Sequence, residues 1–393
     1  MTPLAISDYT LSTALGAGRS VTLDALRSGR SGLAPVSFLD VDLSTWVGEV
    51  AGLDGMRLVP ELADFDCRNN RLAWLGLQQD GFADSVRAAR QRWGAHRVAV
   101  LLGTSTAGLL ETELAYRRRG PGGELPADVR YQERHNTYSV AAFVTNAFDL
   151  RGPSWVVSTA CSSSAKVFAS AARLIAAGLV DAAIVGGVDT LCQTTLYGFS
   201  SLELLSPDVC RPWDAQRRGL SIGEGAAFAL LERDAGTPLG WLLGVGESND
   251  GYHLSTPHPE GAGAVAAMRA ALADAALAPS DIGYVNLHGT ATPSNDASED
   301  RAVHAVFGAV TPCSSTKGAT GHTLGAAGGV EAAICLLTLN HGLMPGGLNV
   351  REVDSALKLN YLRANREAPL GVVLSNSFGF GGTNASLVLG APG

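Results

Sequence analysis

Short, nearly continuous apolar segments alternate along the chain with longer segments in which apolar residues recur at helical spacing. The short segments are typical of strands that are covered on both faces. Five of them are predicted to be strands: 97–103, 154–159, 182–188, 282–289 and 371–377. Helical spacing is clearest in residues 164–178 and 263–277. This alternation predicts an α/β protein with deeply buried sheets.

Weak internal similarity indicates that the fold is built from two related halves. Residues 96–108 resemble residues 281–294, because in both a strand is followed by the pattern Gly-Thr-x-Thr. A polar stretch ends at residue 238, so we expect the halves to comprise residues 1–238 and 239–393. Residues 109–153 have no counterpart in the second half, and we expect them to form an insertion.

Composition and charge narrow the class of protein. Of the 393 residues 46% are hydrophobic, enough for a large core, and the net charge of −8 argues against a nucleic-acid partner. The six cysteines form no CxxC pair and show no metal-ligand spacing, so we expect neither disulfides nor a metal site. The N-terminal residues do not resemble a signal peptide, and no uncharged apolar stretch reaches the roughly 18 residues that span a bilayer. These features predict a soluble cytoplasmic protein in a reducing compartment.

Cys161 lies where a predicted strand passes into a predicted helix, in the stretch STACSSS. At a helix N-terminus the free amides and the macrodipole favour the thiolate, which is the nucleophilic form of cysteine. The amide of Cys161 could also donate to an oxyanion, and the small neighbouring residues leave room for a substrate carbonyl. A buried, unreactive cysteine is the alternative, and the local sequence leaves both interpretations open.

Two histidines and a lysine are the candidate partners of Cys161. His288 ends a predicted strand, where open α/β sheets place their sites, and His322 lies in a glycine-rich stretch. Lys317 follows Ser-Ser-Thr among small uncharged residues, so a buried ammonium there would need an acidic partner, for which Glu299 is the candidate. The alternatives are core histidines, a surface lysine and an ordinary acidic first turn of a helix.

The stretch NSFGFGG at residues 376–382 places Phe378 and Phe380 among three glycines. Either ring could cover a pocket while the glycines act as hinges. A glycine-rich turn between two strands is the alternative interpretation.

Rival catalytic motifs are weak. The pattern S-x-x-K occurs at residues 163–166, but the S-D-N and K-T-G motifs that accompany it in serine acyl-enzymes are absent. The chain also lacks a G-x-S-x-G elbow, a P-loop and a complete G-x-G-x-x-G. Hydrolase and nucleotide-binding functions therefore lose support.

Taken together, the candidate residues resemble the β-ketoacyl-acyl carrier protein synthases of the elongating, Cys-His-His type. The matching stretches are STACSSS, RPWDAQRRG, HGTATP, STKGATGH and NSFGFGGTN. They extend from about residue 95 to residue 390, and their joint order makes the signal specific. The resemblance implies the thiolase fold, in which two similar halves stack as five α/β/α/β/α layers. It also implies the family's reaction, a decarboxylative condensation that extends fatty-acid, polyene or polyketide chains.

The resemblance assigns a role to each candidate. Cys161 accepts an acyl chain from a carrier-protein thioester, and the amides of Cys161 and Phe380 form the oxyanion hole. His288 and His322 bind the malonyl thioester carbonyl as CO₂ leaves and the carbanion forms. Lys317 positions this network, with Glu299 as its expected support.

The resemblance also implies how the substrate is held. No cofactor is bound, because the substrates arrive on the 4′-phosphopantetheine arm of an acyl carrier protein. Thr290 and Thr292 resemble the pair that binds this arm. Phe380 resembles the gate between acylation and condensation, and Phe378 flanks the same pocket.

Four further residues carry expectations about specificity and docking. Leu220 replaces an aromatic residue that lines the pocket in many family members, and Thr106 falls where members control chain length. Neither residue predicts which acyl chain the protein carries. Arg68 and Arg71 loosely match the docking region for the acidic carrier protein, and a solvated surface is the alternative.

The resemblance further implies a dimer with the strand before Cys161 near its two-fold axis and with residues 109–153 in the interface. Either a homodimer or a heterodimer with a ketosynthase-like chain-length-factor subunit fits. Two other functions stay open: a degradative thiolase, whose second catalytic cysteine would have to be Cys335, and a non-catalytic partner subunit. The complete Cys-His-His set argues against the latter.

Overall fold

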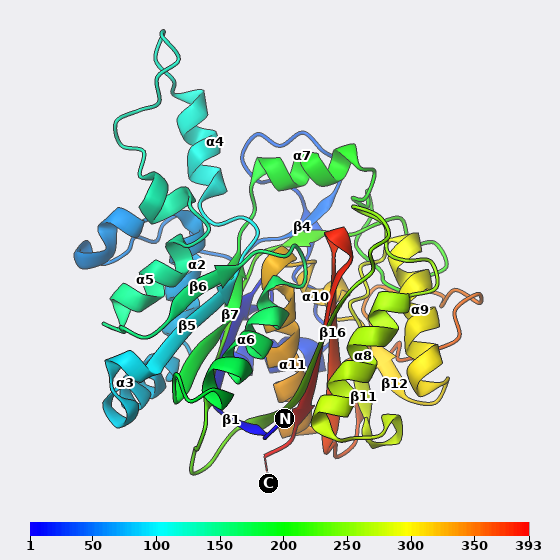
Figure 1. The fold of residues 1–393 in the computed structure, drawn as a ribbon. Helices are drawn as coiled ribbons and strands as arrows, with labels where there is room; N and C mark the ends of the chain where they lie inside the picture. Colours follow the sequence, from blue (N-terminus) through cyan, green and yellow to red (C-terminus); the bar gives the residue numbers. More distant parts are fainter. Residues whose placement is uncertain (393) are drawn as a thin grey trace.

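Twelve strands join into one large sheet that consists of two runs, and two small sheets lie outside it (Figure 1). The computed structural model describes residues 1–392. In spatial order the first run contains β6 (Ser154–Val157), β5 (Val98–Gly103), β7 (Ala182–Asp189), β9 (Gly225–Glu232) and β1 (Leu4–Thr13), with β2 (Gly16–Ala17) paired to β1. The second run continues with β10 (Gly240–Asn249), β17 (Thr383–Gly390), β16 (Val372–Gly379), β11 (Tyr284–Asn286), β12 (Pro312–Ser314) and β14 (Asn360–Tyr361).

The two runs repeat one pairing pattern. In the first, β6, β5 and β7 are parallel and the antiparallel β9 and β1 follow. In the second, β12, β11 and β16 are parallel and the antiparallel β17 and β10 follow. The runs meet where the start of β1 pairs with β10. The chain changes from one run to the other between Glu232 and Gly240; the boundary placed at residue 238 falls in this interval and stays a prediction.

Helices cover both runs and produce five layers (Figure 1). The middle layer consists of α6 (Ser163–Ala176) and α11 (Ala327–His341), which contact each other and strands of both runs. The outer layers consist of α2 (Arg68–Leu77), α3 (Phe82–Trp93) and α5 (Ser139–Ala147) on the first run, and α8 (Ala262–Ala275) and α9 (Pro293–Phe307) on the second. This is the α/β/α/β/α layering of the thiolase fold.

The helix α11 is enclosed in the middle layer and is buried from Ala327 to Leu339. A helix that is apolar on nearly all faces is typical of such a central position. One charged residue, Glu331, lies within the buried part. A buried charge requires a partner. We therefore expect a basic residue to lie close to Glu331.

All five predicted strands and both predicted helices are present. The largest difference is at β11, which ends at Asn286 rather than at residue 289. The amides of His288 and Gly289 donate to the carboxylate of Glu299 instead of continuing the sheet. Four long strands, β1, β9, β10 and β17, were not among the predicted ones.

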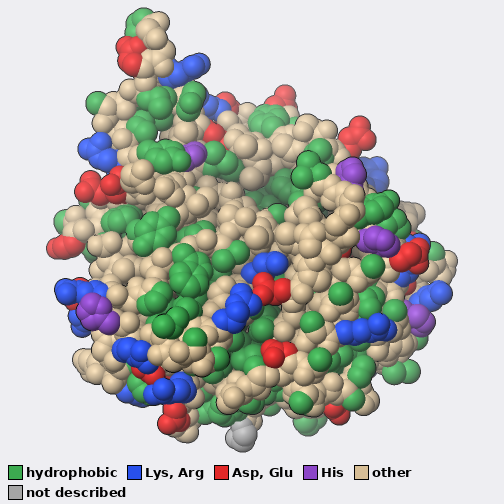
Figure 2. Space-filling model, viewed as in Figure 1, with side chains coloured by type: hydrophobic (Ala, Val, Ile, Leu, Met, Phe, Trp, Pro, Cys, Tyr) green, Lys and Arg blue, Asp and Glu red, His purple; other side chains and the backbone are tan. Residues whose placement is uncertain are grey.

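The predicted insertion at residues 109–153 includes α4 (Leu109–Arg117), the segment after it and α5. Figure 1 shows α4 and that segment projecting from the body, whereas α5 packs on β5 and β6. Beside the insertion, β6 is an edge strand whose four residues are half-buried. Figure 2 shows hydrophobic side chains gathered on this part of the face in view.

The remaining α-helices and strands are short. They are α1 (Arg19–Arg27), α7 (Gln193–Ser201), α10 (Lys317–Thr320), β3 (Ala34–Pro35), β4 (Trp46–Gly48), β8 (Ile222–Gly223), β13 (Leu343–Met344) and β15 (Arg366–Glu367). None of the helices within residues 1–392 has the length and apolar character needed to cross a bilayer.

Candidate active site

Cys161 lies in the turn between β6 and α6, as the sequence predicts. The preceding residue, Ala160, has a left-handed φ of 51°, so the turn is sharp. Hydroxyl groups hold its shape: the amide of Thr159 donates to Ser163 Oγ at 2.9 Å, and that hydroxyl donates to the carbonyl of Ala160. These bonds fix the position of the thiol.

Cys161 is buried, and burial disfavours its thiolate. Only 5% of the residue is exposed, and burial raises the pKa of its thiol to about 11. The charge of Lys317 and the amide of Phe380 lower the pKa by less than burial raises it. Burial thus opposes the thiolate that a helix N-terminus favours, and the reactive form of Cys161 stays a prediction.

His322 contacts the sulfur of Cys161 through Nε2 at 3.0 Å. Its other ring nitrogen, Nδ1, accepts the amide of Leu324 at 3.2 Å. A neutral imidazole has one protonated nitrogen, so this bond places the proton on Nε2, toward the sulfur. Burial, and then the charge of Lys317, lower the pKa of His322 well below its ordinary value and keep the ring neutral.

His288 follows β11 and faces the ring of His322. The two ring centroids are 5.3 Å apart and the rings are nearly perpendicular, at 85°. Lys317 Nζ lies 3.4 Å from His288 Nδ1, and since an ammonium only donates, Nδ1 accepts and Nε2 carries the proton. Burial first, then Lys317 and His322, lower the pKa of His288 well below its ordinary value. Both histidines are neutral donors through Nε2.

Lys317 is buried in α10 at 1% exposure, and its partner is Glu331 of α11. Its Nζ atom also donates to the carbonyl of His288. The expected pairing with Glu299 is wrong, because the ammonium pairs with Glu331 of α11 in the middle layer and not with Glu299 of α9. Burial raises the pKa of Glu331 to about 7, against the lowering influence of Lys317.

Glu299 supports the backbone rather than the lysine. Its carboxylate accepts the amides of His288 and Gly289 at 2.7 and 2.8 Å. Burial raises its pKa to about 7, and these two hydrogen bonds lower it. Glu299 thus fixes the loop that carries His288.

Known sequence families and curated proteins match this chain over most of its length. The sequence model of the β-ketoacyl synthase N-terminal domain matches residues 69–236, and that of the C-terminal domain matches residues 239–351. The 3-oxoacyl-[acyl-carrier-protein] synthase 2 of Coxiella burnetii is 33% identical over 93% of this chain and 92% of its own. Nodulation protein E of Rhizobium meliloti is 33% identical over 92% of each chain.

The chain belongs to the β-ketoacyl synthase family. Solved structures agree with this assignment. One reports the ketosynthase ApeO in complex with its chain length factor ApeC from Xenorhabdus doucetiae; it matches with 39% identity, a TM-score of 0.91 and coverage of 99% of this chain and 98% of that chain. A β-ketoacyl synthase from Burkholderia phymatum matches with 29% identity, a TM-score of 0.90 and full coverage of both chains.

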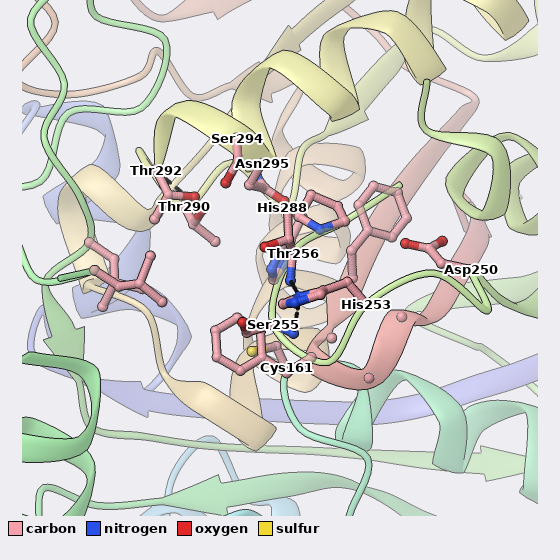
Figure 3. A pocket seen from close by; sticks show the side chains of 18 of the residues that line it. Cys161, Asp250, His253, Ser255, Thr256, His288, Thr290, Thr292, Ser294 and Asn295 are labelled. Carbon is pink, nitrogen blue, oxygen red and sulfur yellow. Dashed lines mark hydrogen bonds between the residues drawn. The ribbon is translucent and has the colours of Figure 1, made fainter. Parts of the chain in front are cut away.

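The synthase has a pocket beside Cys161 (Figure 3). Both histidines line it, and so do five of the residues singled out from the sequence: Leu220, Thr290, Thr292, Phe378 and Phe380. The lining also includes residues that sequence reasoning missed, among them Phe199, Leu204, Asp250, His253 and Asn295. Asp250 and His253 follow β10 in a polar loop whose sequence gives no sign that it covers a site.

The glycine-rich turn after β16 closes one side of the pocket. The amide of Phe380 bonds to the sulfur of Cys161, and its ring lies 5.6 Å from that of Phe199. The ring of Phe378 lies 5.9 Å from that of His288. Gly381 has φ of 78°, in the region that favours glycine, so this turn depends on its glycines.

Thr106 does not line this pocket. Its hydroxyl donates at 2.6 Å, and its amide at 2.7 Å, to the carboxylate of Asp189. Thr104 Oγ1 and the amides of Ser105 and Ala326 donate to the same carboxylate. Burial raises the pKa of Asp189. Asp189, which sequence reasoning missed, thus fastens the end of β5 to the start of α11.

Arg68 and Arg71 are engaged within the protein. Arg68 is 3% exposed and its guanidinium binds Glu224 at 2.6 Å and Asp54 at 2.6 Å. Arg71 pairs with Asp66 at 2.6 Å. A buried, neutralised guanidinium contributes little to the steering of a partner. The burial of Arg68 and the pairing of Arg71 with Asp66 give no support to the expected docking role, which stays a prediction.

The thiolase alternative would need a second cysteine in the pocket. Cys335 is fully buried within α11 and does not line it. The described residues therefore bring one cysteine, Cys161, to the two histidines.

Proposed function

We propose that Cys161 carries the acyl group that this synthase condenses with a malonyl group on an acyl carrier protein. The chain is a condensing acyltransferase of fatty-acid or polyketide synthesis by its family. The observation that carries the residue assignment is the 3.0 Å contact between the Cys161 sulfur and His322 Nε2, beside a pocket that His288 also lines.

In the first half-reaction the Cys161 sulfur attacks the carbonyl carbon of an acyl-carrier thioester. A sulfur–carbon bond forms, the S–H bond breaks, and the carrier leaves as a free thiol that takes up the proton. The amides of Cys161 and Phe380 would stabilise the oxyanion of the tetrahedral intermediate. The placement of the Phe380 amide against the sulfur supports this role. Burial raises the thiol pKa, which favours loss of the proton during the attack over loss before it.

In the second half-reaction the malonyl thioester loses CO₂, and the electron pair of the broken bond forms an enolate. His288 and His322 would donate their Nε2 protons as hydrogen bonds to the enolate oxygen. Their neutrality supports this role, since a neutral donor strengthens its bond as charge develops in the transition state. The enolate carbon then attacks the Cys161 thioester, and the sulfur leaves and regains a proton from solvent.

Lys317 and its carboxylate neighbours would position these donors without contacting substrate. Lys317 bonds to the carbonyl of His288 and faces its Nδ1, while Glu331 holds the ammonium. Glu299 accepts the consecutive amides of His288 and Gly289 in the same loop. The loop that carries His288 is thus fixed from two directions.

Thr290 and Thr292 would bind the phosphopantetheine arm. Both line the pocket, and their hydroxyls lie 2.9 Å apart, close enough to act as one polar contact. No bound cofactor enters the proposed reaction, because both substrates arrive on carrier-protein arms.

Acyl-chain selection would depend on the pocket wall. Leu220 is buried at 3% exposure and lines the pocket, so its size limits the space beside Cys161. Phe380 would act as the gate between the two half-reactions, with Phe378 beside it. Thr106 would act indirectly, because its hydroxyl is held by Asp189.

The synthase would work as a dimer, either of two copies or with a ketosynthase-like chain-length-factor subunit. The half-buried edge strand β6 and the projecting insertion support an interface there. The ketosynthase from Xenorhabdus doucetiae was solved with its chain length factor. The six free cysteines support a cytoplasmic location, where thiols stay reduced.

The test is incubation of the enzyme with acyl-carrier and malonyl-carrier protein, with intact-mass detection of the acyl-enzyme and of the β-ketoacyl product. We expect the acyl adduct on wild type and on Cys67→Ala, a control at a buried cysteine outside the pocket. We expect no adduct on Cys161→Ala. An adduct that survives in Cys161→Ala, or no β-ketoacyl product from wild type alone and with a partner subunit, would overturn the proposal.

A further inference from the structure

The side chains of Cys161, His288 and His322, here called the Cys-His-His cluster, have the composition of a metal site. One ligand atom of each lies within 4.8 Å of the other two. Residues 1–392 contain no other group of three histidine, cysteine or acidic side chains placed to hold a metal ion. Metal-ligand spacing in the sequence does not predict this cluster, because its three residues lie far apart in the sequence.

One pair of ligand atoms in the cluster is nearly as close as in a zinc site, and all three lie within 4.8 Å of one another. Zinc binds cysteine sulfur at about 2.3 Å and histidine nitrogen at about 2.0–2.1 Å, which separates tetrahedral ligand atoms by roughly 3.3–3.6 Å. The sulfur of Cys161 and Nε2 of His322 are 3.0 Å apart, so a small movement would suffice. A metal ion bound here would occupy the sulfur that acylation requires. An enzyme with this cluster therefore benefits from a device that excludes metal.

The contacts behind both histidines are opposite to those of metal-binding histidines. A histidine that binds a metal through Nε2 carries its proton on Nδ1 and donates it to a carboxylate, a carbonyl or water. Here both Nδ1 atoms face donors: the Leu324 amide at 3.2 Å from His322, and Lys317 Nζ at 3.4 Å from His288. Metal could bind only after both ring protons moved to Nδ1, against these donors.

We propose that Lys317 and the Leu324 amide keep divalent metal ions off the Cys-His-His cluster by holding the proton of each imidazole on Nε2. Lys317 also brings a positive charge, which Glu331 holds in place. The same contacts leave both histidines as donors for the condensation. The inference goes beyond the proposed function and does not depend on it, since metal binding is measured without acyl substrates.

The experiment is a titration of wild type and Lys317→Met with Co²⁺, which adopts the geometry of zinc and shows a thiolate-to-cobalt absorption band. Methionine is unbranched and only one atom shorter than lysine, but has neither a donor nor a charge. As the Co–S bond forms, the thiol proton passes to the buffer. We expect Lys317→Met to bind Co²⁺ with an affinity about 10- to 100-fold higher than that of wild type, the usual effect of such partners.

Matched variants separate the proton from the charge. Lys317→Met/Glu331→Gln carries no buried charge at the pair and should gain affinity as well, whereas adding Cys161→Ala to Lys317→Met should remove the band. Protection of Cys161 from iodoacetamide by Zn²⁺ should give the same ranking, and the double variant serves if Lys317→Met does not fold. Wild type that binds as tightly as Lys317→Met, or a folded Lys317→Met that gains no affinity, overturns the proposal.

Discussion

The ammonium of Lys317 pairs with the carboxylate of Glu331 inside the middle layer of the protein. The two side chains are 1% and 3% exposed, so water contributes little to their solvation. The same ammonium donates to the carbonyl of His288. One buried ion pair thus connects the central helix α11 to the loop that carries a proposed donor of the condensation.

Breaking this ion pair should destabilise the fold strongly. Removal of one partner leaves an uncompensated buried charge, so Lys317→Met and Glu331→Leu should each lower the free energy of unfolding by about 3–5 kcal/mol. The double variant should lose less than the sum of the two, as measured by urea unfolding. The exposed pair of Arg87 and Asp84 is the control, and Asp84→Asn should cost less than about 1 kcal/mol. Additive losses in the double variant would contradict this account.

The reactivity of Cys161 should rise steadily with pH. Burial raises its thiol pKa to about 11, so the thiolate fraction should increase about tenfold per pH unit up to that value. Alkylation by iodoacetamide, located by peptide mass between pH 7 and pH 10, should therefore accelerate at every step. Glutathione, an unperturbed thiol, should level off near its ordinary pKa of about 8.5 and serves as the control. A plateau for Cys161 below pH 9 would show that its thiolate is stabilised instead.

Asp189 should contribute to stability through the bonds it accepts. Asp189→Asn places an amide group against backbone N–H donors of Ser105, Thr106 and Ala326, which leaves buried donors unpaired. We expect a loss of about 1–3 kcal/mol in the free energy of unfolding. Thr106→Val removes one hydroxyl donor and should cost about 1 kcal/mol by the same measurement. Equal stability of wild type and Asp189→Asn would exclude this role.

A larger side chain at Leu220 should shift selectivity toward shorter acyl chains. Leu220→Phe fills part of the pocket beside Cys161, and overpacking of this kind costs about 1–3 kcal/mol. The ratio of acylation rates for long and short acyl carriers, followed by intact mass, should fall. Leu202→Phe, at a position that is 51% exposed, is the control and should leave the ratio unchanged. An unchanged ratio in Leu220→Phe would show that this wall does not select the chain.

The fold was predictable where strands are apolar on both faces. All residues of β5 and β7 are buried, so each strand is a nearly continuous apolar stretch that is easily recognised in the sequence. By contrast, β1 contains the buried polar Asp8 and Thr10, which depress its apolar character. Their partners, Arg19 and Asp80, are known only from the structure. Strands of this kind cannot be recognised from periodicity alone.

The site residues that lie in sequence motifs were predictable. The ion pairs between residues from distant segments were not. The stretches around Cys161 and His322 belong to recognisable patterns, and the structure brings the two residues together. Glu331 is a single carboxylate in an apolar helical segment, so nothing nearby marks it as the partner of Lys317. Arg68 is a second example. The sequence around it gives no sign that acidic residues from other segments pair with its guanidinium.

The most direct test of the central claim is a single turnover of enzyme already acylated at Cys161. Wild type mixed with malonyl-carrier protein should lose the acyl group from Cys161 and release CO₂ and β-ketoacyl-carrier in equal amounts. His288→Ala and His322→Ala should form the acyl-enzyme but consume it about 10²–10³ times more slowly, because each lacks one donor to the enolate oxygen. Consumption of the acyl-enzyme by both histidine variants at the wild-type rate would contradict the account.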